Sequence, residues 1–312
     1  MQEAIEQYLA SLTLERGLSP TTVTSYRHDL RLFSDFCKRQ GIASAGNVTA
    51  ADVRAFLRWL QETQPETVTR RRRSDETARR GREPATVARK LAAIKGLFRF
   101  LVAQGQMKRN PTSFIESPRL WRRLPVTLNP SEVVQVLESI TDHRLAGRDL
   151  ALFELLYGAG LRVSEVASLE VGQVNLEAGF LRCIGKGNKE RLVPMGRPAR
   201  SALVRYIETI RPGLVKRHPT TTALFVGQGG GRLTRQRIWQ LVRRYALQGH
   251  VAKRVGPHTF RHSFATHLLA GGADLRVVQE LLGHANITTT QRYTQVDRSR
   301  LKTVHEQFHP RP

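Results

Sequence analysis

Cysteine is scarce in this sequence, and long apolar runs are missing. Cys37 and Cys183 are the two cysteines among 312 residues, and neither belongs to a Cys-x-x-Cys pair. This pattern excludes a disulfide scaffold and a cysteine zinc site, and it is typical of a reducing cytoplasm. No stretch of about 18 apolar residues occurs, so we expect no membrane span. The acidic start Met1–Glu6 is not typical of a signal peptide, and we expect a cytoplasmic protein.

Acidic residues are also few relative to basic ones. The chain has 50 lysines and arginines against 26 aspartates and glutamates, which gives a net charge of +24. Residues 1–125 hold 23 of these basic and 12 of these acidic residues, so both halves of the chain are basic. Because such an excess attracts polyanions, we expect both halves to contact double-stranded DNA.

Two classes of motif are missing. The sequence has no Gly-x-x-x-x-Gly-Lys-Ser/Thr loop, which excludes a P-loop site for ATP. It also has no acidic cluster of the kind that holds two Mg²⁺ ions. We therefore expect neither a cofactor nor a metal.

The first part of the chain predicts four helices. Ser19-Pro20 is typical of a helix start, Gly41 of a helix end, and Thr49 of a second N-cap. Apolar residues recur at steps of three and four within 5–12, 23–37, 53–60 and 87–101. We expect these helices to form a small bundle.

Two segments interrupt the helical pattern. Residues 62–84 lack apolar periodicity, and seven arginines fall within 70–82. We interpret this segment as an exposed loop that follows a phosphate backbone, reaches a partner or is a solvated insertion. Residues 110–125 contain three prolines, which cannot continue a helix. The sequence thus predicts a domain over 1–109, a linker over 110–125 and a second domain over 126–312.

The second domain predicts a mainly helical fold with a small β-hairpin. Strands over 180–184 and 191–194 flank the turn Gly185–Lys189, whose residues tolerate positive φ. Residues 223–226 are a further strand candidate. Helix signals follow at 131–140, 148–158, 163–169, 197–210, 234–247, 258–270, 274–282 and 297–308.

Several side chains in this domain are candidates for chemistry. Arg162 stands between a glycine pair and a new helix, where backbone N–H groups favour an anion. Lys186 lies in the hairpin turn. His258 and Arg261 are three residues apart at the start of one helix and so share a face. Each such residue alone is more often structural, and their order along the chain is the distinctive feature.

That order resembles the catalytic signature of the tyrosine recombinases, also called the phage integrase family: Arg162, Lys186, His258-x-x-Arg261, His284 and Tyr293. The resemblance covers nearly the whole chain. The phrases Gly160–Glu165, Ile184–Arg191 and Leu281–Asn286 are similar to the Xer subgroup. The resemblance to the tyrosine recombinases implies an N-terminal four-helix SAM-like DNA-binding domain and a C-terminal α+β catalytic domain. Ala285-Asn286 and the tail favour the C type of Xer recombinase over the D type, although the sequence leaves that choice open.

The resemblance implies cleavage of DNA through a 3′-phosphotyrosyl link and a Holliday junction. Tyr293 would supply the nucleophilic oxygen, and His258 would take its proton. Arg162 and Arg261 would bind the equatorial phosphate oxygens, which gain negative charge in the transition state.

Two further side chains complete this chemistry. Lys186 would protonate the leaving 5′ oxygen, and His284 would donate a hydrogen bond to a non-bridging oxygen. Because the phosphotyrosine stores the bond energy, a second DNA 5′-hydroxyl can reseal the strand without a cofactor.

The implied partners follow from the Xer resemblance. We expect a tetramer on double-stranded DNA, formed with a paralogous recombinase as two plus two, with a DNA translocase as candidate activator. The preferred role is resolution of chromosome dimers at a dif-like site for segregation at cell division. The alternatives are an integrase of a mobile element, a type IB topoisomerase and a non-catalytic DNA-binding regulator. Apolar positions among Arg298–Phe308 predict a tail helix that docks on a neighbouring protomer.

Overall fold

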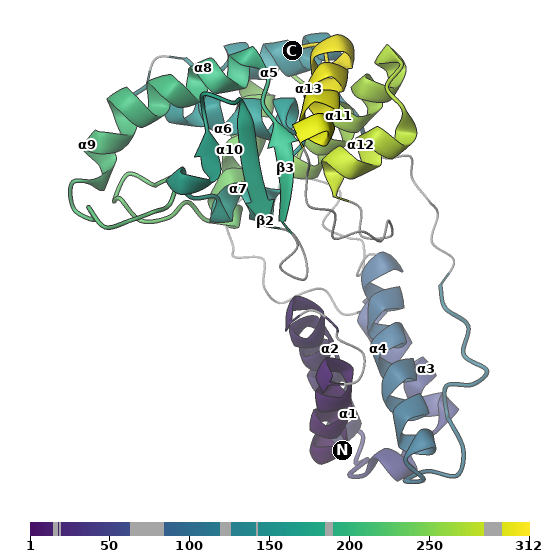
Figure 1. Cartoon of the computed structure of the whole chain (residues 1–312). Coiled ribbons are helices and arrows are strands. Elements are labelled where there is room, and N and C mark those ends of the chain that lie inside the picture. The colour runs from purple at the N-terminus through teal and green to yellow at the C-terminus, as the bar shows by residue number, and fades with distance from the viewer. Residues whose placement is uncertain are drawn as a thin grey trace. The chain divides into compact units, whose positions relative to one another are not determined.

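The computed structural model describes residues 1–14, 18, 20–62, 84–118, 126–141, 143–184, 190–283 and 295–312. The chain divides into two compact units, Met1–Arg123 and Leu124–Pro312 (Figure 1). In this described part, no helix has the length and apolar character needed to cross a membrane. The arginine-rich stretch 70–82 lies outside the described residues.

The first unit is a bundle of the four predicted helices: α1 (Gln2–Leu14), α2 (Pro20–Arg39), α3 (Ala50–Glu62) and α4 (Pro84–Ala103). Their apolar faces meet in one core, where the Phe33 ring meets Phe56 edge-on at 5.1 Å. The predicted N-cap of α3 forms, because Thr49 Oγ1 accepts a hydrogen bond from the Asp52 backbone N–H at 3.3 Å. Ile115 also packs into this core, and the extent of the linker within 110–125 stays a prediction.

An ion pair is buried in the core of the bundle. Asp29 of α2 is 0% exposed and Lys90 of α4 is 2% exposed, with 2.5 Å between Lys90 Nζ and Asp29 Oδ1. The second carboxylate oxygen of Asp29 accepts from Arg89, the neighbouring residue on α4. A buried pair of this kind adds little net stability, but it is costly to break from one side. It therefore fixes how α2 and α4 face each other.

The second unit contains a three-stranded antiparallel sheet in the order β1-β2-β3. The strands are β1 (Val174–Asn175), β2 (Phe180–Ile184) and β3 (Glu190–Pro194). The register places Cys183 opposite Arg191. Strands β2 and β3 pair antiparallel as predicted, with β3 one residue longer than expected. The predicted turn Gly185–Lys189 lies outside the described residues. Strand β1 was missed because two residues are too few to display an alternating pattern.

Helices surround this sheet, and each predicted helix signal of the second unit corresponds to one of them (Figure 1). They are α5 (Pro130–Glu138), α6 (Ala146–Gly158), α7 (Val163–Ser168), α8 (Arg197–Arg205), α9 (Arg211–Val215), α10 (Arg235–Gln248), α11 (Pro257–Gly271), α12 (Leu275–Leu282) and α13 (Gln295–Phe308). Helix α6 is the centre of the core, since every residue from Ala151 to Gly158 is buried. Helices α8 and α11 both pack on it.

The structure differs from the sequence prediction at two places in this unit. The helix expected over 197–210 changes to a π-helical turn over Tyr206–Ile210 before α9, because Pro212 has no N–H to donate and its ring crowds the preceding turn. Residues 223–226 form isolated bridges rather than a strand. The Gly227 N–H already bonds the Gly231 carbonyl oxygen at 2.8 Å, so the chain turns back before a ladder can extend.

Candidate active site

Arg162 lies where α6 has ended and α7 begins. Gly160 has a φ of +56°, which favours glycine, and Arg162 then caps α7 with extended backbone. Three residues on, Glu165 folds back over the helix start. Its Oε2 accepts from the Arg162 backbone N–H at 2.7 Å, and its Oε1 accepts from Arg162 Nη1 at 2.8 Å. The anion expected at this helix start is thus supplied by the chain itself.

Arg261 reaches the same carboxylate from α11. Its side chain is 10% exposed, and Nη1 lies 3.9 Å from Glu165 Oε2. Its terminal nitrogens donate to two separate backbone segments, Nη1 to the Gly160 carbonyl oxygen at 2.6 Å and Nη2 to that of Leu282 at 2.5 Å. Burial, and then the positive charge of Arg162, lower the pKa of Arg261 to about 9. The guanidinium therefore stays protonated at neutral pH.

Arg191 of β3 also binds this carboxylate, although the sequence prediction gave it no role. Its Nη1 donates to Glu165 Oε1 at 2.7 Å, its Nη2 to Glu165 Oε2 at 2.9 Å and its Nε to the Leu281 carbonyl oxygen at 3.2 Å. Burial alone would raise the pKa of Glu165, but the hydrogen bonds and charge of Arg191, with the bonds from Arg162, lower it to about 2. Glu165 is therefore ionised and surrounded by guanidinium groups.

Glu165 and Arg191, to which the sequence analysis assigns no role, could have been identified from their positions. Glu165 follows Arg162 at the spacing of a capping box, in which the third helical residue bonds back to the cap. Arg191 occupies a buried position of β3, between the exposed Glu190 and the half-buried Leu192. A charged residue at such a position needs a buried partner, and Glu165 is that partner.

The backbone directly before His284 is bonded to both predicted arginines. Helix α12 ends at Gly283, where φ is +63°. Arg162 Nη2 donates to the Gly283 carbonyl oxygen at 3.1 Å, one residue after the carbonyl that Arg261 holds. A Cβ at Gly283 would lie 2.9 Å from the Arg191 side chain. Glycine there allows the end of α12 to approach the arginine cluster.

The structure brings together two of the six predicted residues, Arg162 and Arg261. His258 stands in the first turn of α11 and is exposed, while Arg261 on the same helix is buried. Lys186, His284 and Tyr293 lie outside the described residues. The catalytic roles of all six stay predictions.

The charges of the cluster decide which ligand it suits. Among the residues that the structure describes, Arg162, Arg191 and Arg261 surround one carboxylate, that of Glu165, and these four side chains carry two net positive charges. Such a cluster repels a metal cation, whereas guanidinium forks match the oxygens of a phosphate. Arg162 is the most accessible, with a side chain that is 33% exposed. Among the described residues, no group of three or more His, Cys, Asp or Glu is placed to hold a metal.

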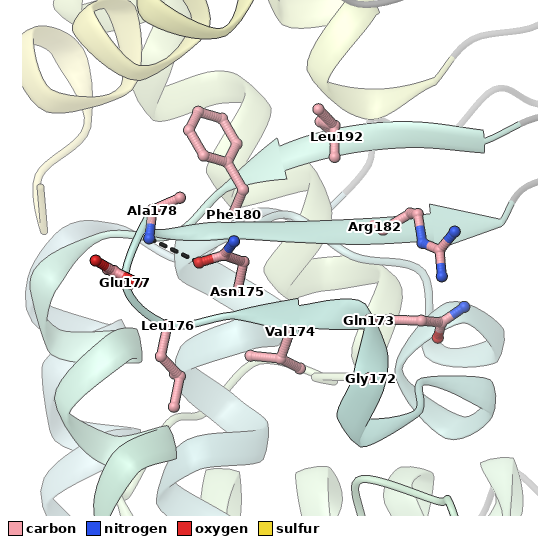
Figure 2. Close-up of a pocket in the computed structure, with 10 residues that line it drawn as sticks. All are labelled: Gly172, Gln173, Val174, Asn175, Leu176, Glu177, Ala178, Phe180, Arg182 and Leu192. Atoms are coloured by element: carbon pink, nitrogen blue, oxygen red, sulfur yellow. Dashed lines mark hydrogen bonds between the residues drawn. The ribbon is translucent and has the colours of Figure 1, made fainter.

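A hollow of about 520 Å³ lies elsewhere, on the sheet (Figure 2). Residues 172–178 form most of its wall, and Phe180, Arg182 and Leu192 complete it. The Ala178 backbone N–H donates to Asn175 Oδ1 at 2.7 Å at its rim. None of the predicted site residues lines this hollow, so volume does not identify the reactive centre.

In this single chain, the tail helix α13 packs on its own unit against β3 and α11 (Figure 1). Its expected docking on a neighbouring protomer stays a prediction. Leu301 is 0% exposed within the core, and Phe308 packs against that core. Beyond the helix, Arg311 Nη2 donates to Glu154 Oε1 of α6 at 2.5 Å. The apolar face of α13 is thus covered within the same chain.

Comparisons with known families match both units. The sequence matches the phage integrase family over residues 127–300. It matches the phage integrase N-terminal SAM-like domain over residues 5–105.

Individual proteins match over the full length. The chain is 40% identical to the tyrosine recombinase XerD of Oceanobacillus iheyensis over 312 residues, 100% of this chain and 99% of the relative. It is also 40% identical to XerD of Staphylococcus saprophyticus, over 100% of both chains. Both are named as the D type, so the preference for the C type drawn from Ala285-Asn286 is not supported.

Solved structures agree with this match. The post-cleavage complex of the XerH site-specific recombinase with a palindromic difH substrate is 27% identical, with a TM-score of 0.65 over 92% of this chain and 80% of the other. The Tn1549 transposon integrase is 20% identical and shares the fold, with a TM-score of 0.67 over 96% and 98% of the two chains.

Proposed function

This chain belongs to the phage integrase family of tyrosine recombinases, enzymes that break and rejoin DNA, and from that premise we propose that Arg162 and Arg261 bind the scissile phosphate. The observation that supports this proposal is that the Arg162 and Arg261 side chains converge on one carboxylate, that of Glu165. They come from segments far apart in the sequence, and both lie within ion-pair distance of Glu165. Two guanidiniums fixed in this way offer paired N–H donors to the non-bridging oxygens of one phosphate.

The reaction we assign to the site needs no metal. The Tyr293 oxygen attacks phosphorus and loses its proton to His258, while the bond from phosphorus to the 5′ oxygen breaks. Lys186 gives that leaving oxygen a proton, and His284 donates to a non-bridging oxygen. The product is a 3′-phosphotyrosyl link, which the 5′-hydroxyl of a second strand attacks to restore the phosphodiester and free Tyr293. Two such exchanges pass through a Holliday junction.

Stabilisation of the transition state is the main task of the arginines. The pentavalent phosphorus carries extra negative charge on its equatorial oxygens, and losing one fixed donor of this kind typically costs about 3–4 kcal/mol in barrier. Arg261 is held by two backbone carbonyls, so its guanidinium is already in place before DNA binds. This preorganisation supports a catalytic role.

The biological role we assign is resolution of chromosome dimers at a dif-like site. Full-length similarity to proteins named XerD and similarity to a XerH recombinase bound to a difH substrate support it. On DNA we expect a tetramer of two such chains and two of a paralogue, with a DNA translocase as activator. We place the protein in the cytoplasm, because Cys37 and Cys183 are both free thiols.

The two units have separate tasks in this proposal. Residues 1–109 form the DNA clamp, 110–125 the linker and 126–312 the catalytic domain. The excess of basic residues in both halves supports contact with DNA by each.

The proposal is tested by Tyr293→Phe, which removes one oxygen and little else. A nicked suicide substrate should trap the unaltered protein covalently on DNA in the presence of a chelator, and Tyr293→Phe should give no covalent band while still binding DNA. Arg162→Ala and Arg261→Ala should bind DNA but react about 100-fold more slowly or worse. A covalent band with Tyr293→Phe would place the nucleophile elsewhere, and a dependence on Mg²⁺ would mean a different mechanism. A non-catalytic regulator would give no covalent band at all.

A further inference from the structure

A carboxylate next to two phosphate-binding arginines acts against them. Glu165 is ionised, and its Oε1 is 2.8 Å from Arg162 Nη1 while its Oε2 is 3.9 Å from Arg261 Nη1. An unscreened negative charge at this distance would weaken the stabilisation that both arginines give to the extra negative charge of the phosphate in the transition state. The effect is strong in a buried site, where the effective dielectric constant is low.

Arg191 offsets that charge. Its two terminal nitrogens each bond a different oxygen of Glu165, at 2.7 and 2.9 Å. This forked arrangement is the strongest geometry available between a guanidinium and a carboxylate. The Arg191 side chain is only 6% exposed and that of Glu165 only 4%, so water does not take over the same task.

Arg191 itself is well placed to remain in this position. Its Nε donates to the Leu281 carbonyl oxygen at 3.2 Å, and Gly283 leaves room for its side chain. Its strand β3 pairs with β2 in a fixed register. The Arg191 side chain is 6% exposed, so it is more enclosed than that of Arg162, which is 33% exposed.

We propose that Arg191 is a positioning residue for DNA cleavage, which neutralises Glu165 so that Arg162 and Arg261 keep their full positive charge for the scissile phosphate. This inference rests on the proposed role of those two arginines. In it, Glu165 and Arg191 act as one neutral pair: Glu165 orients Arg162, and Arg191 cancels the charge that this orientation requires.

The alternative is that Arg191 only holds β3 and α7 together. The two roles differ in what happens when both partners of the pair are replaced. Arg191→Gln leaves Glu165 uncompensated, so the cluster loses one positive charge. The double variant Glu165→Gln with Arg191→Gln removes both charges and returns the cluster to two positive charges, while it loses even more of the hydrogen bonds that join the strand to the helix.

The experiment measures two quantities on the full chain. One is the single-turnover rate of covalent trapping on a nicked suicide substrate at saturating protein. The other is the dissociation constant for the same DNA, measured by fluorescence anisotropy. The matched control is Arg182→Gln, which removes one positive charge from β2, the strand next to Arg191, where the Arg182 side chain is 52% exposed.

We expect Arg191→Gln to slow trapping by about 100-fold, the size seen when one charge-stabilising donor is lost. The dissociation constant should change by less than about threefold, because charge in the transition state is what the pair controls. The double variant should recover at least about tenfold of the lost rate, and Arg182→Gln should trap at the unaltered rate. A double variant as slow as Arg191→Gln, or slower, overturns the proposal.

Arg191→Lys provides a second test that does not depend on the fold of the glutamine variant. It keeps the positive charge while it loses the fork. We expect it to trap within about tenfold of the unaltered rate, since the charge of Glu165 remains cancelled. A folded lysine variant that binds DNA yet traps as slowly as Arg261→Ala would overturn the proposal.

Failure of this inference is distinguishable from failure of the proposed function. If the unaltered chain traps DNA and Tyr293→Phe does not, the function stands, and the order of the Arg191 variants decides the inference alone. If the unaltered chain does not trap DNA, both fall together.

Discussion

The Nε2 atom of His305 donates to the carbonyl oxygen of Gly158 at 2.5 Å. A carbonyl oxygen can only accept, so Nε2 carries the proton. His305 belongs to α13, and Gly158 is the last residue of α6, four residues before Arg162. The tail helix is thus bonded to the segment that leads into the arginine cluster, and the stability of the two is linked.

The first prediction concerns pH. Burial lowers the pKa of His305, and burial together with the charge of His305 lowers the pKa of His309 to about 3. The unfolded chain binds protons at these histidines near pH 6.5, whereas the folded chain resists them. The free energy of unfolding should therefore fall as the pH drops from about 6.5 towards 3, by up to about 1.4 kcal/mol per pH unit for each histidine.

Urea denaturation at several pH values measures this slope. His309→Phe keeps a ring among Tyr157, Phe264 and His305 and should reduce the slope by about one proton. An identical slope in His309→Phe would mean that His309 does not titrate on unfolding.

The second prediction concerns the tail beyond α13. Arg311→Ala should lower the free energy of unfolding by about 3 kcal/mol, because it leaves Glu154, whose side chain is 3% exposed, buried without its partner. Arg300→Ala, within α13, is the control, since the pair of Arg300 with Glu280 is more exposed and should contribute less than about 1 kcal/mol. Equal effects of the two substitutions would contradict the burial argument.

The third prediction concerns the turn before α7. Gly160→Ala should be strongly destabilising, because φ is +56° and the new Cβ would lie 2.4 Å from the Phe264 ring. The left-handed conformation alone costs about 1–2 kcal/mol for a residue with a Cβ. Gly158→Ala, whose Cβ would meet Ala199 at 3.9 Å, is the control and should cost little. Thermal melts of both variants measure these losses of stability, and equal melting temperatures would contradict the prediction.

The fourth prediction concerns DNA affinity. If both basic units clamp the duplex, log affinity should fall by about 0.9 per tenfold increase in salt for each phosphate neutralised. Residues 1–125 and 126–312, expressed separately, should each bind more weakly and with a smaller salt slope than the full chain. Full affinity from one half, or affinity insensitive to salt, would contradict the clamp.

Local signals in the sequence predicted most of the fold. The cap at Thr49 formed because its Oγ1 accepts from the Asp52 backbone N–H at 3.3 Å, a bond between residues three apart. The hairpin strands were visible because strand pairing and turn residues are also local. The signal over 197–210 is helical throughout in the structure, and only its π-helical turn over Tyr206–Ile210 was not predicted.

The site depended on contacts that sequence spacing does not encode. Arg162 and Arg261 were identified by their order along the chain, yet the carboxylate that joins them was assigned no role. Arg191 bonds Glu165 across 26 residues, and no periodicity links a strand position to a helix cap. The packing of α13 on β3 and α11 was not predicted for a related reason. An amphipathic face shows that a helix needs a partner, but not which segment supplies it.

Arg261 joins separate segments of the chain, because its side chain bonds the backbone carbonyl oxygens of both Gly160 and Leu282. The two bonds span 101 and 21 residues of the sequence. The cluster is therefore complete only when these segments have folded together. A partly folded or newly synthesised chain lacks an assembled cluster and therefore lacks the means to cut DNA efficiently. For an enzyme that breaks and rejoins DNA, a cluster that exists only in the folded chain confines efficient cleavage to folded molecules.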